Sequence, residues 1–208
     1  MIRGKGGALQ VQHSFREFLS RIISKNRITL SFVGAAVFLY FAAPARSTVI
    51  AGIPLILIGE IIRTWSSGFI KKNEVLSQSG PYSMTRNPLY LGNFLIGMGF
   101  SIMTNNIILL CLFLAVFFFI YTMTIQSEEK LLLAKFGDTY IKYKERVPVF
   151  FPLKAASFKK SSLENSSENS SGHFDWHLVI KHREHHTWLG IIAGLIIFLV
   201  KLAFFTAG

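Results

Sequence analysis

Apolar stretches separated by short polar segments are the main pattern of this 208-residue chain. Five of them lie near residues 28–43, 49–67, 89–103, 106–125 and 188–208. A helix needs about 20 predominantly apolar residues to span a bilayer, and the fourth and fifth stretches reach this length without flanking residues. The pattern predicts an all-α, polytopic membrane protein with about five transmembrane helices.

The connections and small residues of these stretches refine the prediction. Residues 104–106 are too few for anything but a tight helical hairpin. Pro54 lies inside the second stretch and is expected to kink that helix, which membrane helices tolerate. Gly92, Gly97 and Gly99 are expected to give the third helix a small-residue face for close packing.

The distribution of positive charge adds an orientation to this prediction. The net charge is +11, with six Lys or Arg in residues 1–27, three in residues 68–88, ten in residues 126–187 and none in residues 104–106. Since cytoplasmic segments of membrane proteins carry the excess of Lys and Arg, the N-terminus and both long polar segments are predicted to be cytoplasmic, and the C-terminus outside. The charges lie between apolar stretches, so the expected partner is the lipid bilayer and not a nucleic acid.

Composition divides the chain into three parts. Residues 1–152 are predicted to form a membrane domain, residues 153–187 a polar flexible linker with a His-rich surface segment, and residues 188–208 a C-terminal transmembrane helix. Five of the six histidines lie between His173 and His186, with pairs four residues apart that could bind a metal on a helix. Few carboxylates and no cysteine accompany them, so solvated histidines are expected there, and no metal site.

The first polar segment with candidate chemistry leads into the third apolar stretch. Arg86 and Asn87 precede Pro88, which is well placed to open a helix. The free N–H groups at such a helix start attract anions, and Arg86 can hold a carboxylate through two hydrogen bonds. Tyr82 and Tyr90 would flank this site. The alternative is a loop that turns, starts a helix and anchors its tyrosines at the membrane interface.

The second candidate segment follows the fourth apolar stretch. Glu128 and Glu129 are adjacent carboxylates near a membrane end, where they would hold a cation or hydroxyl groups unless they are simply solvated. Farther on, Tyr140, Tyr143 and Val147 have helical spacing and predict the apolar face of an amphipathic helix along the membrane surface.

A third polar feature lies inside the second apolar stretch. Glu60 and Arg63 are three residues apart and could pair on one helix face. Charged groups within a span are candidates for function. The alternative is an ion pair close to the cytoplasmic interface, with the Arg63 side chain reaching toward water.

Taken together, these motifs resemble the isoprenylcysteine carboxyl methyltransferase family and its phospholipid N-methyltransferase relatives. The motifs are Gly80-Pro-Tyr, Arg86-Asn-Pro-Leu-Tyr-Leu-Gly92, Glu128-Glu129, Phe136-Gly, Tyr140, Tyr143 and Arg146-Val-Pro148. They occur in this order and flank a helical hairpin. The resemblance implies that residues 1–152 are a membrane methyltransferase domain with a cytoplasmic cofactor pocket, roofed by the segment after the fourth span.

The resemblance also implies the cofactor and the site residues. The methyl donor would be S-adenosylmethionine, and the acceptor a lipophilic molecule from the bilayer: an isoprenylcysteine-like carboxylate, a phospholipid amine or another membrane-soluble small molecule. The cofactor-binding residues implied are Tyr82, Arg86, Asn87, Pro88, Tyr90, Gly92, Glu128, Glu129, Tyr140, Tyr143 and Arg146. Arg86 and Asn87 are also the candidates for a catalytic role.

One position departs from the family pattern. Asn87 stands where many members have His, and Asn cannot shuttle a proton near neutral pH. A carboxylate acceptor is already ionised, whereas an amine must first lose a proton, so the lack of an obvious base favours a carboxylate or thiolate acceptor.

Two other function classes remain as alternatives at this level. An NADPH-dependent membrane reductase of related architecture would need more Arg and Lys around its phosphates than Arg86 and Arg146. A non-catalytic membrane transporter or assembly protein would usually have internal repeats and interrupted helices, and the sequence has neither.

Overall fold

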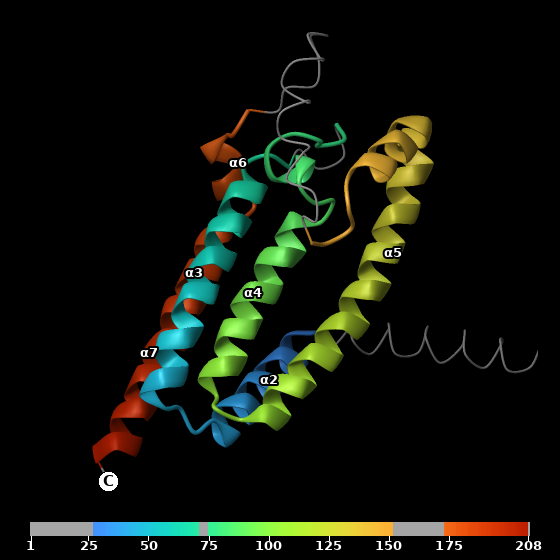
Figure 1. Cartoon of the computed structure of the whole chain (residues 1–208). Coiled ribbons are helices and arrows are strands. Elements are labelled where there is room, and N and C mark those ends of the chain that lie inside the picture. Colours follow the sequence, from blue (N-terminus) through green and yellow to red (C-terminus); the bar gives the residue numbers. More distant parts are fainter. Residues whose placement is uncertain (1–26, 71–74, 152–172, 208) are drawn as a thin grey trace, which may run out of the picture. The chain divides into compact units, whose positions relative to one another are not determined.

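The computed structural model describes residues 27–70, 75–151 and 173–207, and these contain helices and connecting segments but no strand. The helices, labelled in Figure 1, are α2 (Arg27–Phe41), α3 (Arg46–Ser67), the short 3-10 helix η1 (Gly80–Ser83), α4 (Pro88–Met103), α5 (Ile107–Arg146), α6 (Trp176–Lys181) and α7 (Glu184–Ala207). The predicted all-α class is confirmed.

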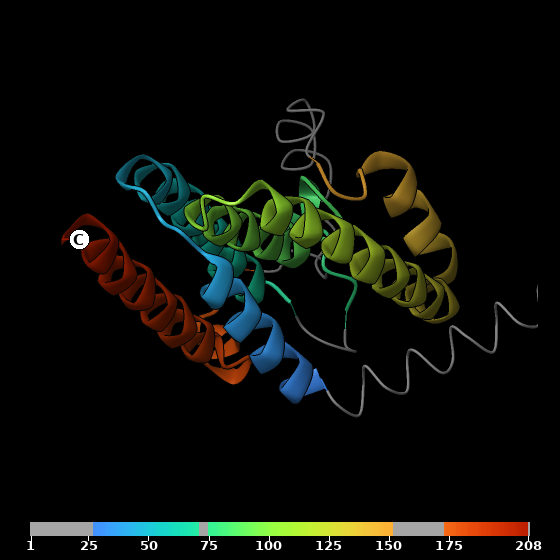
Figure 2. The same ribbon diagram turned by 90° about the horizontal axis from the view of Figure 1, so that it is seen from below.

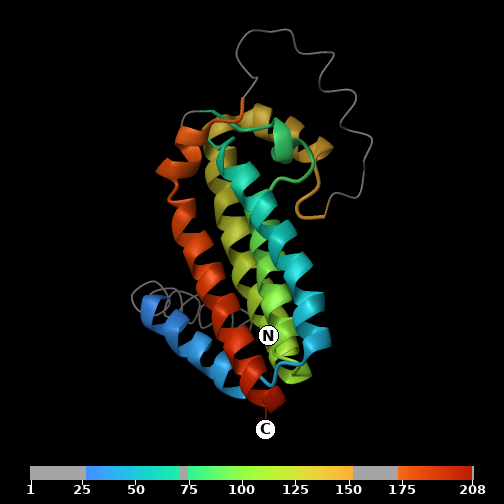
Figure 3. The same ribbon diagram turned by 90° about the vertical axis from the view of Figure 1, so that its left-hand side faces the viewer.

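The chain divides into two compact units, residues 1–42 and residues 43–208. The first contains α2, an apolar helix of 15 residues. The second contains all the other helices, and in it α4 packs against both α3 and α5, while α7 lies along α3 (Figures 1 and 3). Neighbouring helices of this unit are antiparallel, because α3 and α5 run toward the end at which α4 and α7 begin.

Three of the described helices, α3, α5 and α7, are long and apolar enough to cross a membrane, which makes this an integral membrane protein. Helix α4 is apolar but has 16 residues. The count of five spans therefore stays a prediction. Pro54 lies within α3, which is assigned as a single helix from end to end.

Glycines bring the backbones of α3 and α4 together. A Cβ atom added to Gly52 would lie 2.6 Å from the carbonyl oxygen of Gly99, and one added to Gly59 would lie 2.7 Å from that of Gly92. The predicted small-residue face of α4 is confirmed for Gly92 and Gly99. Gly97 instead faces α5, where an added Cβ would lie 2.3 Å from the ring of Phe113.

Helix α5 is longer than its apolar stretch and bends near its end. It begins at the predicted tight hairpin, where the Asn106 side chain accepts hydrogen bonds from two N–H groups of the first turn, and it continues well past residue 125. Gly137 has φ +48°, a conformation that favours glycine, and there the helix changes direction. The last part of α5 therefore turns away from the long first part (Figure 2).

The part of α5 after the bend is the predicted amphipathic helix. Tyr140, Tyr143 and Val147 are all buried there, and they pack with apolar side chains from α5 and from the segment before η1. The predicted apolar face is confirmed.

The segment predicted as linker and surface is folded over its last part. Residues 153–172 lie outside the described residues. Beyond them, Asp175 caps α6 by accepting from the N–H of His177, and its own N–H donates to the carbonyl of Gly68 at the end of α3. Helix α7 begins at Glu184, four residues before the predicted start of the last span. The helix starts earlier because Glu184 is buried and forms an ion pair with Arg63 of α3. Local composition does not reveal such a distant partner.

Candidate functional site

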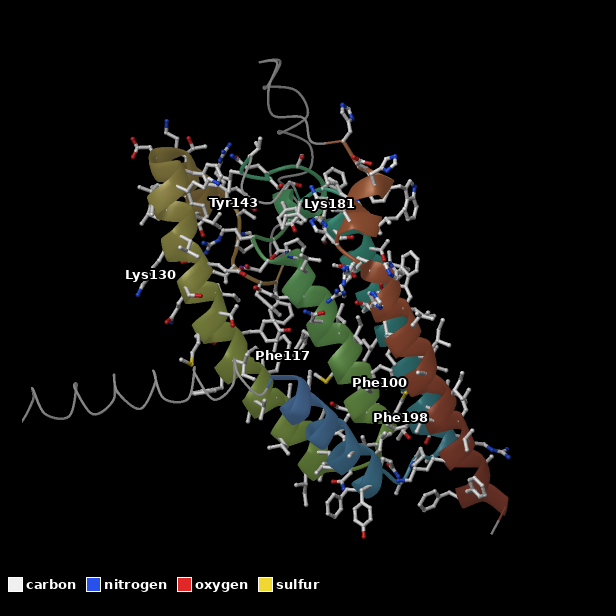
Figure 4. All side chains as sticks on the ribbon, turned by 180° about the vertical axis from the view of Figure 1, so that it is seen from behind. Phe100, Phe117, Lys130, Tyr143, Lys181 and Phe198 are labelled. Carbon is white, nitrogen blue, oxygen red and sulfur yellow. The ribbon has the colours of Figure 1, made fainter. Side chains whose placement is uncertain are left out.

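A cavity of about 720 Å³ lies in the second unit, where α3 ends and α4 and α7 begin. One wall comes from η1, the start of α4 and the middle of α5, and the other from the end of α3 and the turn between α6 and α7. Tyr143 and Lys181, which line opposite walls, lie at the same end of the helices in Figure 4. This size is typical of sites for small ligands.

Arg86 joins the two motif segments. Its guanidinium is almost fully buried and forms an ion pair with Glu129, and it donates to the hydroxyl of Tyr140 at 3.3 Å. The other carboxylate oxygen of Glu129 accepts from Nζ of Lys144, beyond the bend of α5, at 2.9 Å. The first candidate segment, the second and the amphipathic helix therefore meet at one carboxylate.

Tyr90 and Glu128 form a second link between α4 and α5. The Tyr90 hydroxyl donates to the Glu128 carboxylate, and the Tyr90 ring packs edge-on against Tyr121 with ring centroids 4.7 Å apart. The amide of Asn93 donates to the Tyr121 hydroxyl at 3.0 Å. Glu128 lines the cavity, so its carboxylate is an anionic group available to a ligand.

Asn87 ties the loop before α4 to the chain after α5. Its side-chain amide donates to the carbonyl of Val149 at 2.9 Å, and the N–H of Arg86 donates to the carbonyl of Pro148 at the same distance. The hydroxyl of Thr85 also donates to Val149. The segment after α5 thus covers the loop, and Asn87 serves as a structural contact at the position where many family members have His.

Two buried donors at the cavity have no hydrogen-bond partner among the described residues. They are the hydroxyl of Tyr82, whose residue is 7% exposed, and Nε of Arg86. Both residues line the cavity. Burial raises the pKa of the Tyr82 phenol, so it stays protonated near neutral pH. Since buried polar groups are normally satisfied, these two donors are candidates for hydrogen bonds to a ligand or to water in the cavity.

Arg63 pairs with Glu184 and not with Glu60, the carboxylate nearest to it in the sequence. Its Nη2 atom lies 2.8 Å from the carboxylate of Glu184 on α7, and its Nη1 atom donates to the side-chain oxygen of Asn93 on α4. Glu60 instead accepts from the hydroxyl of Thr64 at 3.1 Å. The predicted pairing of Glu60 with Arg63 is therefore wrong, because the guanidinium faces α4 and α7 rather than its own helix.

The implied site residues separate into three groups. Seven line the cavity: Tyr82, Arg86, Asn87, Pro88, Tyr90, Glu128 and Tyr143. Glu129 and Tyr140 contact Arg86 directly. Gly92 packs against α3, where an added Cβ would lie 2.6 Å from the Arg63 side chain, and Arg146 contacts Lys142 and Gln78 at the surface. The last two are not among the residues that line the cavity.

Sequence reasoning missed the wall formed by the α6–α7 turn. Lys181, His182, Arg183 and Glu184 all line the cavity. Their charges resemble those of any solvated segment, so composition alone gave no signal for them. His185 and His186 are exposed, and within the described ranges no group of three or more His, Cys, Asp or Glu is placed to hold a metal ion.

Part of the chain is similar to known methyltransferases. Residues 47–139 match the family model described as phospholipid methyltransferase. The chain is 33% identical over 82 residues to the protein-S-isoprenylcysteine O-methyltransferase of Schizosaccharomyces pombe. The aligned part covers 39% of this chain and 35% of that protein. It is 32% identical over 133 residues to the enzyme of the same name from Saccharomyces cerevisiae, covering 58% and 55% respectively.

A bacterial protein with a different name is also similar. The chain is 34% identical over 103 residues to the cobalt-zinc-cadmium resistance protein CzcN of Cupriavidus metallidurans, covering 49% of the chain and 46% of that protein. The chain spans about half the length of the curated relatives it matches. Over residues 47–139 it is therefore similar to the phospholipid methyltransferase family, and its similarity to the two named protein-S-isoprenylcysteine O-methyltransferases covers 39% and 58% of the chain.

Proposed function

We propose that this protein transfers a methyl group from S-adenosylmethionine to a lipophilic acceptor at the cavity described above. The observation that carries the proposal is that Arg86, Tyr90 and Glu128, from two separate motif segments, line one cavity of about 720 Å³. The similarity of residues 47–139 to phospholipid methyltransferases supports the class of reaction, since the relatives include named methyltransferases.

The polar groups of the cavity fit S-adenosylmethionine. This molecule has a cationic sulfonium, an ammonium group and a carboxylate. The carboxylate of Glu128 suits the cationic groups, and Nε of Arg86 with the hydroxyl of Tyr82, both buried without a partner in the described part of the chain, can donate to the ligand carboxylate. Glu129, held by Arg86 and Lys144, would keep the guanidinium in place.

The other residues of the cavity would position the reactants. When bound, S-adenosylmethionine supplies an activated methyl group, and an in-line displacement depends mainly on holding the two reacting atoms in contact. Leu131, Leu132 and Phe136 give the cavity an apolar wall. Leu131 is also 70% exposed on α5, so this wall continues to the outer surface, where a lipophilic acceptor would enter from the bilayer.

The cavity end of the second unit is the side that we assign to the cytoplasm. The long polar segments rich in Lys and Arg connect helices at this end, whereas the connection between α4 and α5 at the other end has no charged residue. This asymmetry supports a cytoplasmic active site and an external C-terminus.

The number of cationic side chains at the cavity favours the reductase alternative, so NADPH is needed as a control ligand. Five cationic side chains line the cavity: Arg63, Arg86, Lys135, Lys181 and Arg183. A nicotinamide cofactor with several phosphates would need such groups. However, Arg63 and Arg86 are already paired with carboxylates, and the family match supports methyl transfer. NADPH therefore belongs in the same experiment.

Calorimetry on the full chain in detergent tests the proposal. Wild-type protein is expected to bind S-adenosylmethionine and not NADPH. Glu128→Gln and Arg86→Ala are each expected to weaken binding at least about tenfold, since a hydrogen bond to a charged group contributes about 1.5–3 kcal/mol. Arg146→Ala is the matched control, because this arginine lies outside the cavity, and its affinity should equal that of the wild type.

The outcomes separate the three function classes. Because Arg86→Ala removes a buried ion pair, its melting temperature must be measured alongside, and Glu128→Gln provides a variant without that complication. Binding of NADPH in place of S-adenosylmethionine would indicate that the protein is a reductase. Binding of neither would leave the transporter or assembly reading.

A further inference from the structure

His182 occupies the turn between α6 and α7, on the cavity wall that lies outside the family-matched segment. Its N–H donates to the carbonyl of Leu178 at 2.9 Å and so ends α6. The next residue, Arg183, has φ +57°, which reverses the chain before α7 begins. These features place the imidazole at a defined point of the wall.

The turn is attached to α3 on both sides of His182. Before it, the N–H of Asp175 donates to the carbonyl of Gly68 at 3.0 Å, and the ring of Phe174 packs so close to Gly68 that an added Cβ would lie 2.4 Å away. After it, Glu184 is 4% exposed and pairs with Arg63 at 2.8 Å. The position of His182 is therefore supported by two separate contacts with one helix.

One nitrogen of the His182 imidazole lies against a backbone acceptor. Its Nδ1 atom lies 3.1 Å from the carbonyl oxygen of Ser67. A carbonyl oxygen only accepts hydrogen bonds, so Nδ1 carries the hydrogen. In the neutral ring the lone pair is then on Nε2. This arrangement, with one nitrogen held by an acceptor, is how a histidine is oriented to take a proton at the other nitrogen.

The carboxylates and the Asn87 amide of the motif segments already have hydrogen-bond partners. Asn87 has no titratable group, and its amide is bonded to Val149. Glu129 is held by Arg86 and Lys144, and Glu128 accepts from Tyr90. Of the described residues that line the cavity, His182 is the one histidine.

On the basis of the proposed methyl transfer, we propose that His182 is a catalytic residue whose Nε2 accepts the proton of the methyl acceptor. The acceptor has a protonated nucleophilic atom, such as an amine nitrogen. Its bond to hydrogen breaks and the proton goes to Nε2. The electron pair left on the acceptor forms the new bond to the methyl carbon, while the bond between methyl and sulfur breaks with its electrons staying on sulfur. The imidazolium then returns its proton to water.

With His182 on its wall, the cavity has a base that the motif segments lack. The expectation that the site has no base rested on Asn87, because many family members have His at that position. The α6–α7 turn supplies a different histidine from a segment about 95 positions later in the chain. An acceptor that needs deprotonation is therefore compatible with this cavity.

Two variants isolate the proposed role. His182→Asn keeps a donor to the carbonyl of Ser67 but has no basic atom, and His182→Ala leaves space for added imidazole. The full chain in mixed micelles would be assayed with phosphatidylethanolamine as the amine probe and with a farnesylated cysteine as the already ionised carboxylate probe. His185→Asn, at an exposed histidine outside the cavity lining, is the matched control.

Methylation of the amine probe is expected to fall about 100-fold or more in His182→Asn, which is the usual contribution of general acid–base catalysis. Its affinity for S-adenosylmethionine should not change. Added imidazole should restore activity in His182→Ala, and His185→Asn should behave as wild type. Unchanged amine methylation in His182→Asn would overturn the proposal. So would a wild-type protein that binds S-adenosylmethionine but methylates the carboxylate probe alone, or neither probe.

A second measurement does not depend on activity. In full-length protein with 15N-labelled histidine, the His182 signals are assigned by their loss in His182→Asn, and the nitrogen shifts report the tautomer. We expect hydrogen on Nδ1 and a free Nε2, and hydrogen on Nε2 would contradict the proposal. Failure of the proposed function is seen separately, as absence of S-adenosylmethionine binding in the wild type.

Discussion

Glu129 shows how one side chain holds the site together at the residue scale. Its two carboxylate oxygens accept from Arg86 and from Lys144, which belong to the loop before α4 and to the part of α5 after the bend. Arg86 is 6% exposed and Glu129 22%. When one partner of a buried ion pair is removed, the other remains as an uncompensated charge, so this carboxylate matters more than a surface glutamate.

We therefore expect Glu129→Gln to lower both stability and cofactor affinity. Because the pair is partly exposed, the loss of unfolding free energy should be about 1–3 kcal/mol, which is the usual cost of leaving a buried partner without its hydrogen bond. Thermal melting in detergent, with and without S-adenosylmethionine, measures both effects. Glu145→Gln, an exposed position on the same helix, should melt like the wild type, and equal melting of the two variants would contradict the prediction.

Helices α3 and α4 form the closest contact among the elements. Gly52 and Gly59 of α3 face Gly99 and Gly92 of α4, backbone against backbone. Without a hydrophobic effect to drive association inside lipid, close packing of small residues is a main source of helix attraction. The contact also places Arg63, one turn after Gly59, within hydrogen-bonding distance of Asn93, which directly follows Gly92.

Gly59→Ala should separate these helices. The new Cβ would lie 2.7 Å from a backbone carbonyl that has no rotamer to change, and overpacking of this kind costs about 1–3 kcal/mol. Gly190→Ala on α7 is the matched control, because nothing lies within 4 Å of its Cβ position. It should be neutral or add up to about 1 kcal/mol through helix propensity. Detergent melting curves test both, and a stable Gly59→Ala variant would show that the two backbones are not in contact.

The bend of α5 is the other feature at the scale of elements. A helix that continued straight past Gly137 would carry Tyr143 away from η1, whereas in the bent helix its hydroxyl donates to the carbonyl of Tyr82 at 2.6 Å. The bend also brings Lys144 back to Glu129, fifteen residues earlier in the chain. The bend at Gly137 thus allows the last part of α5, with Tyr143, to cover the cavity.

At the scale of the whole molecule, the second unit has one end that carries the cavity and most of the charge. Helix α7 begins at this end, with Glu184 on the cavity wall, and carries the chain to the opposite end. If the cavity faces the cytoplasm, as the positive charges indicate, residue 208 must lie outside.

Reporter fusions test this orientation. A phosphatase fused after Gly208 should be active, and a fluorescent protein that matures only in the cytoplasm should stay dark at that position. A fusion within residues 153–172 should give the reverse result, because this segment connects two helix ends on the cavity side. A fluorescent fusion at Gly208 would place the cavity outside and would overturn the assignment of the cytoplasmic side.

Much of the local structure followed from the sequence because its causes are local. Hydropathy placed the helices, since about 20 apolar residues are needed to cross a bilayer. Pro88 marked the start of α4 and residues 104–106 the hairpin, as turn chemistry requires. The spacing of Tyr140, Tyr143 and Val147 predicted a buried face, because helical periodicity puts them on one side.

Tertiary structure decided what distant residues do to one another. Arg63 pairs with Glu184, 121 residues away, rather than with Glu60, three residues away. The sequence by itself determined the apolar helices and the two motif segments, because apolar periodicity and turn residues act within a few positions. The second cavity wall, with His182, was decided by packing, because the α6–α7 turn is held on α3 by the pairing of Glu184 with Arg63 and by the hydrogen bond from Asp175 to Gly68.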